Sequence, residues 1–326
     1  MTLTVTREEL DALEPEWEEL VLRLPEPVPF VHPAWQRVWL TEFANGREPY
    51  IYAVRDEGAL VGVAPLLRED DRLTLVGHYS ICDYMDVVVP PERTQAFLSA
   101  LLGELANDSW TELELRGLRG DSPTLAELPA AAEAAGLTVE REKEAVAPRI
   151  ELAESWEAFV ASLSKKDRHE LRRKLRRLEE AGEVEFRAYT TPEEVTIRLP
   201  TLLRFMVESR PDKAAFMTEQ MGRFFHVMVE ALSQKGLLRL FELELDRKTV
   251  ASILCFDLGG QLMLYNSGYD PEYGQLGVGF ASKALCIRDA IATGHRYVDM
   301  LRGHEPYKYR LGGEDRTIYR CVVRRA

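Results

Sequence analysis

The sequence Gln261-Leu-Met-Leu-Tyr-Asn-Ser267 is an apolar, strand-like run that leads directly into Gly268-Tyr-Asp-Pro-Glu-Tyr273. A pair of glycines follows in Gln275-Leu-Gly-Val-Gly279, and a helix pattern begins there. A glycine-bracketed turn that opens a helix presents backbone amides at the positive end of the helix dipole, where they can hold a phosphate. The stretch therefore predicts a strand–turn–helix unit for a phosphate-bearing ligand. The simpler interpretation is that Gly277 and Gly279 only allow close packing of helix on strand.

A second strand pattern, Tyr297 to Leu301, leads into the polar sequence Arg302-Gly-His-Glu-Pro-Tyr-Lys308. A polar cluster directly after a strand is placed to face the reactive end of a ligand held by the preceding turn. Asp299 lies among apolar neighbours, so it either takes part in such a site or only fixes the following loop. Lys308 is likewise either a site residue or a surface lysine.

Length and composition limit the kind of protein. A chain of 326 residues is long for one core, so two domains are expected, and 46% hydrophobic with 29% charged residues is typical of a soluble globular protein. A net charge of −13 disfavours a surface that follows nucleic acid along its whole length. No apolar run approaches the roughly 20 residues of a membrane span. The acidic N-terminus lacks the order of a signal peptide, so a cytoplasmic location without membrane association is expected.

The four cysteines are scattered, with no pair at metal-ligand spacing, so neither a zinc site nor a disulfide framework is predicted. The first half of the chain reads as an α/β mixture with a largely antiparallel start. Helices are expected at residues 7–22, 33–43, 92–106 and 122–135, and strands at 50–55, 60–67, 73–76, 84–89, 111–118 and 137–142.

The second half repeats this order. Helices are expected at 155–181 (broken near Ser164), 192–207 and 218–233, followed by strands at 237–245, 250–257 and 261–267, one more helix, and strands at 297–301 and 317–324. Two copies of one fold are therefore predicted, divided near Glu144 to Arg149, with domains at 1–145 and 146–326. No glycine-turn phosphate site is visible before residue 150, so the first copy is expected to be non-catalytic.

This order resembles the acyl-CoA N-acyltransferase (GNAT) fold. The resemblance is closest to the tandem-domain acetyltransferases related to cellulose-biosynthesis proteins of the CelD type, which share their architecture with the Fem aminoacyltransferases. It rests on Gly268-Tyr-Asp-Pro-Glu272, on Leu276-Gly-Val-Gly279 and on Asp299-Met-Leu-Arg-Gly-His-Glu-Pro-Tyr-Lys308, and it extends to His32-Pro-Ala-Trp35. It implies an α/β (α+β) protein of two tandem GNAT-like domains, each a mixed, mostly antiparallel sheet flanked by helices.

The resemblance also implies an activity. An acyl group would pass from acetyl-CoA or another acyl-CoA, without a metal, to an amine on a small molecule or sugar held in a cleft between the domains. Lys308 would stabilise the tetrahedral intermediate, and Tyr309 or its neighbour Tyr307 would protonate the leaving thiolate. Possible bases, anchors or supporting carboxylates are Glu305, Asp299, Asp270 and Glu272. Donor contacts would come from Asn266, Ser267, Gln275, Leu276, Gly277, Val278, Gly279 and Phe280.

One departure concerns the turn itself. The family's turn reads Arg/Gln-x-x-Gly-x-Gly/Ala, whereas here Gln275 stands two residues before Gly277 and Gly274 occupies the expected slot. The amides of Leu276 to Phe280 need no side chain to bind pyrophosphate. Two alternatives remain open: a Fem-like transferase that uses aminoacyl-tRNA, and a non-catalytic binding or accessory protein that retains the fold.

The segment Lys165 to Arg177 carries eight basic and two acidic residues, a net charge of +6, with leucines at helical spacing. It is either a solvated helix or a face for a polyanion such as a coenzyme phosphate or tRNA. In the first half, Trp35 and Trp39 lie four residues apart and predict a packed helix face. Asp83 and Asp86 flank Tyr84 and are expected to belong to loop structure.

Overall fold

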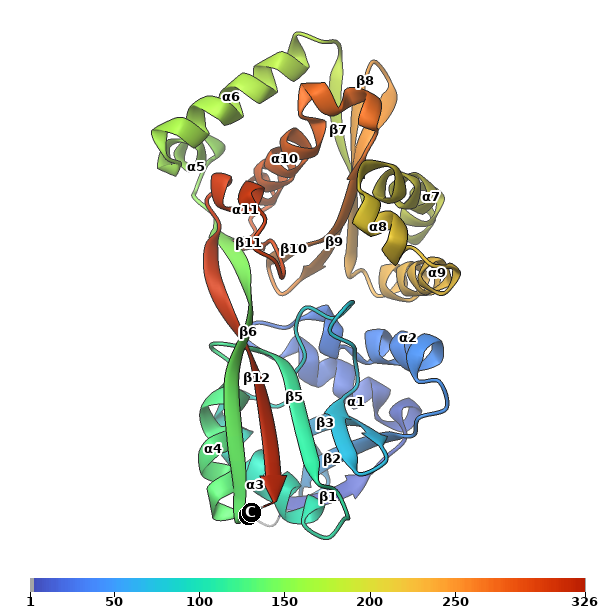
Figure 1. The fold of residues 1–326 in the computed structure, drawn as a ribbon, viewed down its shortest axis with the longest axis vertical. Helices are drawn as coiled ribbons and strands as arrows, with labels where there is room; N and C mark the ends of the chain where they lie inside the picture. The colour runs from blue at the N-terminus through green and yellow to red at the C-terminus, as the bar shows by residue number, and fades with distance from the viewer. Residues whose placement is uncertain (1–2, 326) are drawn as a thin grey trace. The chain divides into compact units, whose positions relative to one another are not determined.

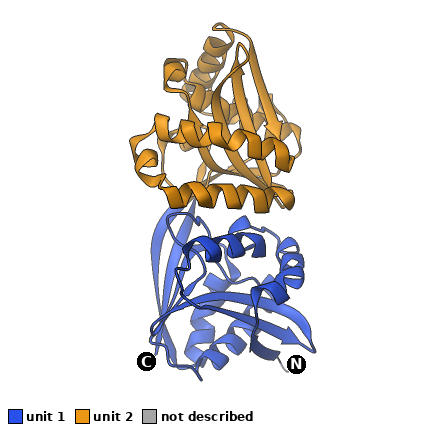
Figure 2. Ribbon diagram, turned by 90° about the vertical axis from the view of Figure 1, so that its right-hand side faces the viewer, with its two compact units in different colours: residues 1–146, 316–326 blue, residues 147–315 orange. Residues whose placement is uncertain are grey.

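The computed structural model describes residues 3–325, which form a mixed α/β protein with mostly antiparallel strands and flanking helices (Figure 1). The chain divides into two compact units, one within residues 1–146 and 316–326 and the other within 147–315 (Figure 2). The expected division assigned everything after residue 145 to the second domain. The difference lies in the last strand, which belongs to the first unit.

The first unit begins with β1, a strand that the sequence analysis did not predict, and only its last residue, Arg7, fell within the helix expected at residues 7–22. Leu3 to Arg7 alternates apolar and polar residues and pairs antiparallel with the second strand, so the helix starts only at Leu10. The elements of this unit are β1 (Leu3–Arg7), α1 (Leu10–Leu22), α2 (Pro33–Phe43), β2 (Pro49–Asp56), β3 (Ala59–Glu69), β4 (Arg72–Leu75), α3 (Thr94–Leu105), β5 (Glu112–Arg119), α4 (Pro123–Ala134) and the start of β6 (Leu137–Glu151).

The helix predicted at residues 33–43 is confirmed as α2. Pro33 occupies its first turn, and the ring Nδ1 of His32 accepts a hydrogen bond of 3.2 Å from the backbone N–H of Ala34. Trp35 and Trp39 are both buried, in agreement with the expected packed face. A tight helix start and two large aromatic rings on one side fix this helix in the core.

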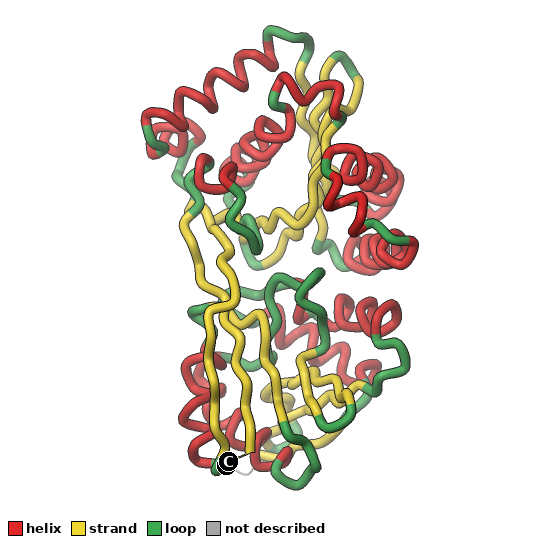
Figure 3. The backbone as a smooth tube through the Cα atoms, viewed as in Figure 1, coloured by secondary structure: helices red, strands yellow, loops and turns green. Residues whose placement is uncertain are grey.

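The strand predicted at residues 84–89 is wrong. Between β4 and α3 the chain forms a loop, drawn green in Figure 3, and its β-type contact with the sheet is one isolated bridge between Val63 and Val88. Pro90 and Pro91 follow directly and cannot donate to a strand ladder, which ends the extended run before it gains a second partner.

In the second unit three further elements escaped the sequence analysis, namely the edge strand β7 and the short helices α8 and α11. The unit contains α5 (Trp156–Ser162), α6 (Lys165–Glu179), β7 (Val184–Tyr189), α7 (Pro192–Ser209), α8 (Pro211–Phe216), α9 (Glu219–Gln234), β8 (Leu238–Leu245), β9 (Lys248–Leu258), β10 (Gln261–Tyr269), α10 (Val278–Ala292), β11 (Tyr297–Asp299) and α11 (Pro306–Arg310). The predicted break near Ser164 is confirmed, since the Ser164 side chain caps α6.

The sheet of the second unit has the order β11-β10-β9-β8-β7, with β10 and β11 parallel and the other pairs antiparallel. Helices α5, α6 and α10 contribute to one buried cluster with the sheet, whereas α7 packs on β10 and α9 packs on α7 (Figure 1). In the described chain no helix combines the length and apolar character required to cross a bilayer.

Strand β6 continues through the expected boundary near residues 144–149 instead of ending at Glu142. Its last residues pair with β11, as in the contact of Arg149 with Asp299. The final strand, β12 (Glu314–Arg325), lies between β5 and β6 and runs antiparallel to β5. The first unit thus has the strand order β1-β2-β3-β4-β5-β12-β6.

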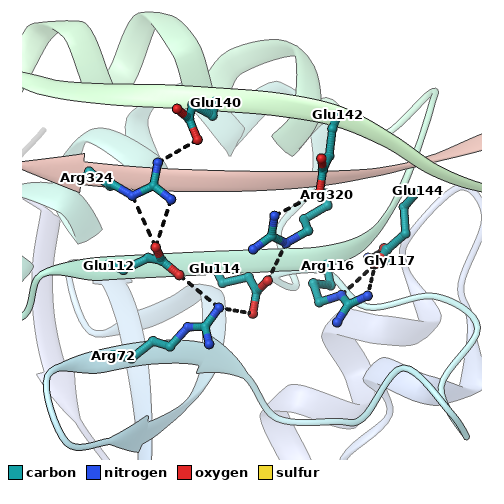
Figure 4. Close-up of polar contacts among 10 residues, drawn as sticks. All are labelled: Arg72, Glu112, Glu114, Arg116, Gly117, Glu140, Glu142, Glu144, Arg320 and Arg324. Atoms are coloured by element: carbon teal, nitrogen blue, oxygen red, sulfur yellow. Dashed lines mark hydrogen bonds and ion pairs between the residues drawn. The ribbon is translucent and has the colours of Figure 1, made fainter.

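Ion pairs fasten β12 in this position (Figure 4). Arg324 contacts Glu112 of β5 at 2.9 Å and Glu140 of β6 at 2.6 Å. Arg320 pairs with the buried Glu114 of β5 and, at 2.8 Å, with Glu142 of β6. Opposite charges on neighbouring strands favour this register, and each arginine connects both partners of β12. Further contacts extend this group of ion pairs. Arg72 pairs with both Glu112 and Glu114, and Glu144 contacts the Arg116 side chain and the N–H of Gly117.

Candidate functional site

Strand β10 carries a bulge in the middle of the second unit. Its pairing with β9 shifts register between Leu264 and Asn266, and its parallel pairing with β11 covers only Gln261 to Met263. Because β11 ends at Asp299, the two strands separate beyond this point. The far end of β10, which includes Asn266 and Ser267, is therefore left with backbone groups on its β11 side that a ligand can reach.

The turn after β10 has the conformation that the glycine pattern predicted. Gly277 has φ +75°, a left-handed conformation, and it directly precedes α10. A Cβ at Gly279 would lie 2.9 Å from the ring of Tyr269, so this position also requires glycine. The side chain of Val278 is buried, and Gln275 is exposed. Since the first N–H groups of a helix have no partner within it, the start of α10 can receive an anion.

A lysine from the basic helix α6 lies over this turn. The Nζ of Lys174 is only 2.8 Å from the position that a Cβ on Gly277 would take, and it is 5.5 Å from the centre of the Phe280 ring. Its acidic neighbour is Glu170, at 3.6 Å. Leu171 and Leu178 of α6 are buried, so the helix packs by one edge and directs Lys174 toward the start of α10.

Two lysines that the sequence analysis missed lie in the same region. Lys213 of α8 donates a hydrogen bond of 2.7 Å to the carbonyl oxygen of Ser267. Lys283 of α10 donates one of 3.0 Å to the carbonyl oxygen of Gly279, and its Nζ lies 5.1 Å from the centre of the Tyr307 ring. The two lysines thus bind the strand end and the helix start on either side of the glycine turn.

Burial lowers the pKa of both lysines because a desolvated ammonium is destabilised. The pKa of Lys213 falls to about 7, first through burial and then through repulsion by Lys283 and Arg210. The pKa of Lys283 falls to about 8, chiefly through burial. A large fraction of Lys213 is therefore a neutral amine near pH 7, which is the form that can accept a proton.

Lys308 is buried and has partners for all of its protons. Its Nζ donates to the carbonyl oxygens of Leu301, Arg302 and Gly303 at 2.8, 2.9 and 3.2 Å, and it pairs with Glu305 at 3.0 Å. It thus holds the loop that follows β11, and it is no surface lysine. Its predicted contact with a reaction intermediate remains a prediction.

Asp299 supports the same loop. One carboxylate oxygen of Asp299 accepts a hydrogen bond of 2.7 Å from the N–H of Leu301, a residue with the unusual φ of +55°. Burial raises the pKa of Glu305, but the neighbouring Lys308 ammonium outweighs this effect and the pKa is lowered overall. Glu305 is therefore an ionised partner of Lys308.

The structure separates the two tyrosine candidates. Tyr307 lies under the Lys283 ammonium, and burial together with the charge of Glu305 raises its pKa. Tyr309 is partly exposed, and its hydroxyl donates to Asp315 at 2.8 Å. Only Tyr307 is thus part of the group around Lys283. Residues two positions apart on a helix point to opposite sides, and sequence spacing alone does not show which side faces the site.

Asp270 and Glu272 belong to the turn and not to this group. The Asp270 side chain caps the short 3₁₀ helix Pro271–Leu276 by accepting a hydrogen bond from the Glu272 N–H, and Lys248 pairs with both carboxylates at 3.1 and 3.5 Å. Among the residues from 3 to 325, no three His, Cys, Asp or Glu side chains gather as a metal site would require.

Part of the chain matches a known protein family. Residues 165–309 match the acetyltransferase (GNAT) domain family. The matched segment contains the bulged strand, the glycine turn and both lysines, and it supports acyl transfer as the chemistry of the second unit. No curated protein matches the chain.

Solved structures show the same fold at low sequence identity. FemX is similar with a TM-score of 0.67 and 11% identity over 97% of this chain and 96% of its own. A conserved protein of unknown function from Bacteroides thetaiotaomicron has a TM-score of 0.62 and 12% identity over 99% and 100% of the two chains. The tandem GNAT protein from the clavulanic acid biosynthesis pathway has a TM-score of 0.51 and 14% identity over 98% of each.

Proposed function

We propose that the second unit transfers an acyl group from acetyl-CoA or another acyl-CoA to the amine of a small molecule or sugar, in the cytoplasm. The observation that carries this proposal is the left-handed Gly277 at the start of α10 with the Lys174 ammonium above it. Backbone amides and a lysine converging on one point suit the pyrophosphate of coenzyme A.

The thioester would lie along the free side of β10 beyond its bulge. A backbone N–H among Asn266, Ser267 and Gly268 would stabilise the oxyanion that forms when the amine attacks the carbonyl carbon. The new C–N bond leaves a proton on the nitrogen, and neutral Lys213 would accept it. Its position beside the Ser267 carbonyl supports this assignment.

The C–S bond then breaks, and the departing thiolate needs a proton. We assign the donor as the Tyr307 hydroxyl, whose ring lies 5.1 Å from the Lys283 Nζ. Burial and Glu305 disfavour the phenolate that remains after proton transfer, and the nearby cations Arg210 and Lys283 would offset part of this cost. Holding the two substrates together in this geometry supplies several kcal/mol of the rate enhancement.

The test compares binding of acetyl-CoA to the wild-type chain and to two lysine variants of α6. Lys174→Gln removes the ammonium over Gly277, and Lys166→Gln makes the same change at an exposed position of the same helix. The dissociation constant measured by calorimetry should rise about tenfold, equivalent to ~1.4 kcal/mol, in the first variant and stay unchanged in the second. Failure of acetyl-CoA and longer acyl-CoAs to bind the wild-type chain would refute the proposal.

A second candidate is transfer from aminoacyl-tRNA. The exposed basic residues Lys165, Lys166, Arg172 and Arg177 of α6 have no ion-pair partner within residues 3–325, and this unpaired positive charge suits a polyanionic backbone. Replacing Arg172 and Arg177 with glutamate should weaken tRNA binding and flatten its salt dependence. If instead only acyl-CoA binds, and binds both proteins equally, the cationic face is a solvated helix surface.

A further inference from the structure

The first unit contains a cavity of about 220 Å³ that the proposed acyl transfer does not use. Its walls are mainly apolar and include Val28, Val31, Met85, Val87 and Val89. At the ~30 Å³ that one water molecule occupies, this volume has room for about seven non-hydrogen atoms. The cavity therefore fits a small organic molecule.

The cavity lies between the loop that precedes α3 and the end of β5. The loop is fixed by a hydrogen bond of 3.1 Å from the Met85 N–H to the Gly117 carbonyl and by the bridge of Val88 with Val63. In the second unit the corresponding place, between β10 and α10, holds the glycine turn. Here Pro90 and Pro91 stand before α3 and lack N–H groups, so this cavity is not built for a phosphate.

The charged side chains around the cavity carry a net negative charge. Arg119 contacts Glu26 at 3.1 Å and Asp121 at 3.7 Å, and Arg316 contacts the same two carboxylates. These two arginines offset the charges of the two carboxylates. Asp86, which also lines the cavity, is the remaining charge.

Only neutral groups donate hydrogen bonds to Asp86 among the described residues. The Val87 N–H donates at 2.8 Å, and the hydroxyl groups of Ser122 and Thr124 also contact the carboxylate. Burial raises the pKa of Asp86, because the charged form is poorly solvated and Arg119 offsets only part of this cost. A carboxylate in an apolar cavity without a cation in direct contact is stabilised by an incoming one.

We propose that this cavity binds a small organic cation, namely a primary ammonium group carried on a compact apolar body. The ammonium donates hydrogen bonds to Asp86, and the body packs on Val28, Met85 and Val87. The bound ammonium neutralises the net negative charge of the cavity. This site lies within the first unit, it is separate from the donor turn of the second, and it does not depend on the acyl transfer proposed above.

The experiment compares two probes of equal size on the wild-type chain by calorimetry. Cyclohexylamine carries the ammonium, and cyclohexanol replaces it with a neutral hydroxyl. The amine should bind at least tenfold more tightly, because the charge-assisted hydrogen bond to Asp86 is lost with the alcohol. Equal affinities for the two probes, or no binding of the amine up to millimolar concentrations, would overturn the proposal.

Two variants then locate the interaction. Asp86→Asn should reduce the affinity for cyclohexylamine to that for cyclohexanol, whereas Asp121→Asn should leave it within about twofold, because Arg119 and Arg316 already offset Asp121. A wild-type affinity in Asp86→Asn would contradict the assignment. The wild-type comparison stands by itself if this variant does not fold. In the wild type, amine binding should weaken as the pH falls and Asp86 takes up its proton.

Discussion

The ammonium group of Lys213 donates a hydrogen bond of 2.7 Å to the carbonyl oxygen of Ser267. The bond joins α8 to the part of β10 that lies beyond its bulge and beyond its pairing with β11. It places an amine with a pKa of about 7 beside the strand end where the proposed reaction occurs. The first two predictions follow from this contact.

Lys213→Met should remove the proton acceptor of the proposed reaction. In the wild type kcat should rise with pH through about 7 and then level off as Lys213 loses its proton. In the variant kcat should fall by roughly 10²- to 10³-fold, and this rise should disappear. Lys166→Met, at an exposed site on α6, serves as the control. An unchanged pH profile in Lys213→Met would exclude Lys213 as the base.

The same substitution should change how stability depends on pH. The Lys213 pKa is about 7 in the folded chain and near 10.5 in the unfolded chain, so the unfolded chain binds more protons between these values. The free energy of unfolding of the wild type minus that of Lys213→Met should therefore increase by on the order of 1 kcal/mol per pH unit within this window. Urea denaturation at several pH values measures it. A constant difference would show that Lys213 keeps an ordinary pKa.

Lys308→Met should destabilise the second unit. It removes the donor for three carbonyl oxygens and leaves Glu305 without its cation, at a cost of about 3 kcal/mol, which lowers Tm by roughly 6 to 12 °C. Arg310→Met, on the exposed side of α11, should have little effect. A loss of kcat with an unchanged Tm would instead support the direct contact with the intermediate that the family resemblance implies.

Gly277→Ala should weaken donor binding and cost about 1 to 3 kcal/mol of stability. Alanine is strained at φ +75°, and its Cβ would displace the Lys174 ammonium from the start of α10. Gly274→Ala is the matched control, since its Cβ would make an ordinary contact of 3.5 Å with Tyr269. Calorimetry with acetyl-CoA and a thermal melt measure both effects. Identical behaviour of the two variants would contradict the role of the left-handed turn.

The two arginines of β12 should differ in importance. Arg320→Met leaves the buried Glu114 with one fewer partner and should cost about 2 kcal/mol, whereas Arg324 is more exposed and its loss should cost under about 1 kcal/mol. Denaturant titration of each variant measures the difference. Equal costs would mean that the burial of Glu114 does not determine how much each arginine of β12 contributes to the free energy of unfolding.

The sequence was sufficient where local chemistry decides the structure. The start of α2 at Pro33, the helix break near Ser164 and the glycine turn before α10 were all predicted, because helix ends and left-handed positions leave a local signature. The strand expected at residues 84–89 failed because an extended, apolar run forms a strand only if a neighbour pairs with it.

The site was only partly predictable for a related reason. Lys283 lies one helical turn after Gly279, and this spacing could have identified it. Lys213 had no such signal, since its partner Ser267 is 54 residues away and α8 shows no strong periodicity. Lys308 was singled out as a candidate, yet the spacing gave no indication that three backbone carbonyls surround it.

The position of β12 has a consequence for biosynthesis. Residues 147–315 leave the ribosome before the strand that completes the first unit, so the unit encoded second can finish folding before the one encoded first. Until β12 is synthesised, β5 and β6 lack the strand that pairs with both of them. Arg72 offsets part of the charge of Glu112 and Glu114, and together with Glu140 and Glu142 these residues still form an acidic border, which disfavours pairing with a similar border on another nascent chain. The arginines of β12 neutralise this border when they arrive, so the same glutamates first prevent wrong pairing and then select the correct strand.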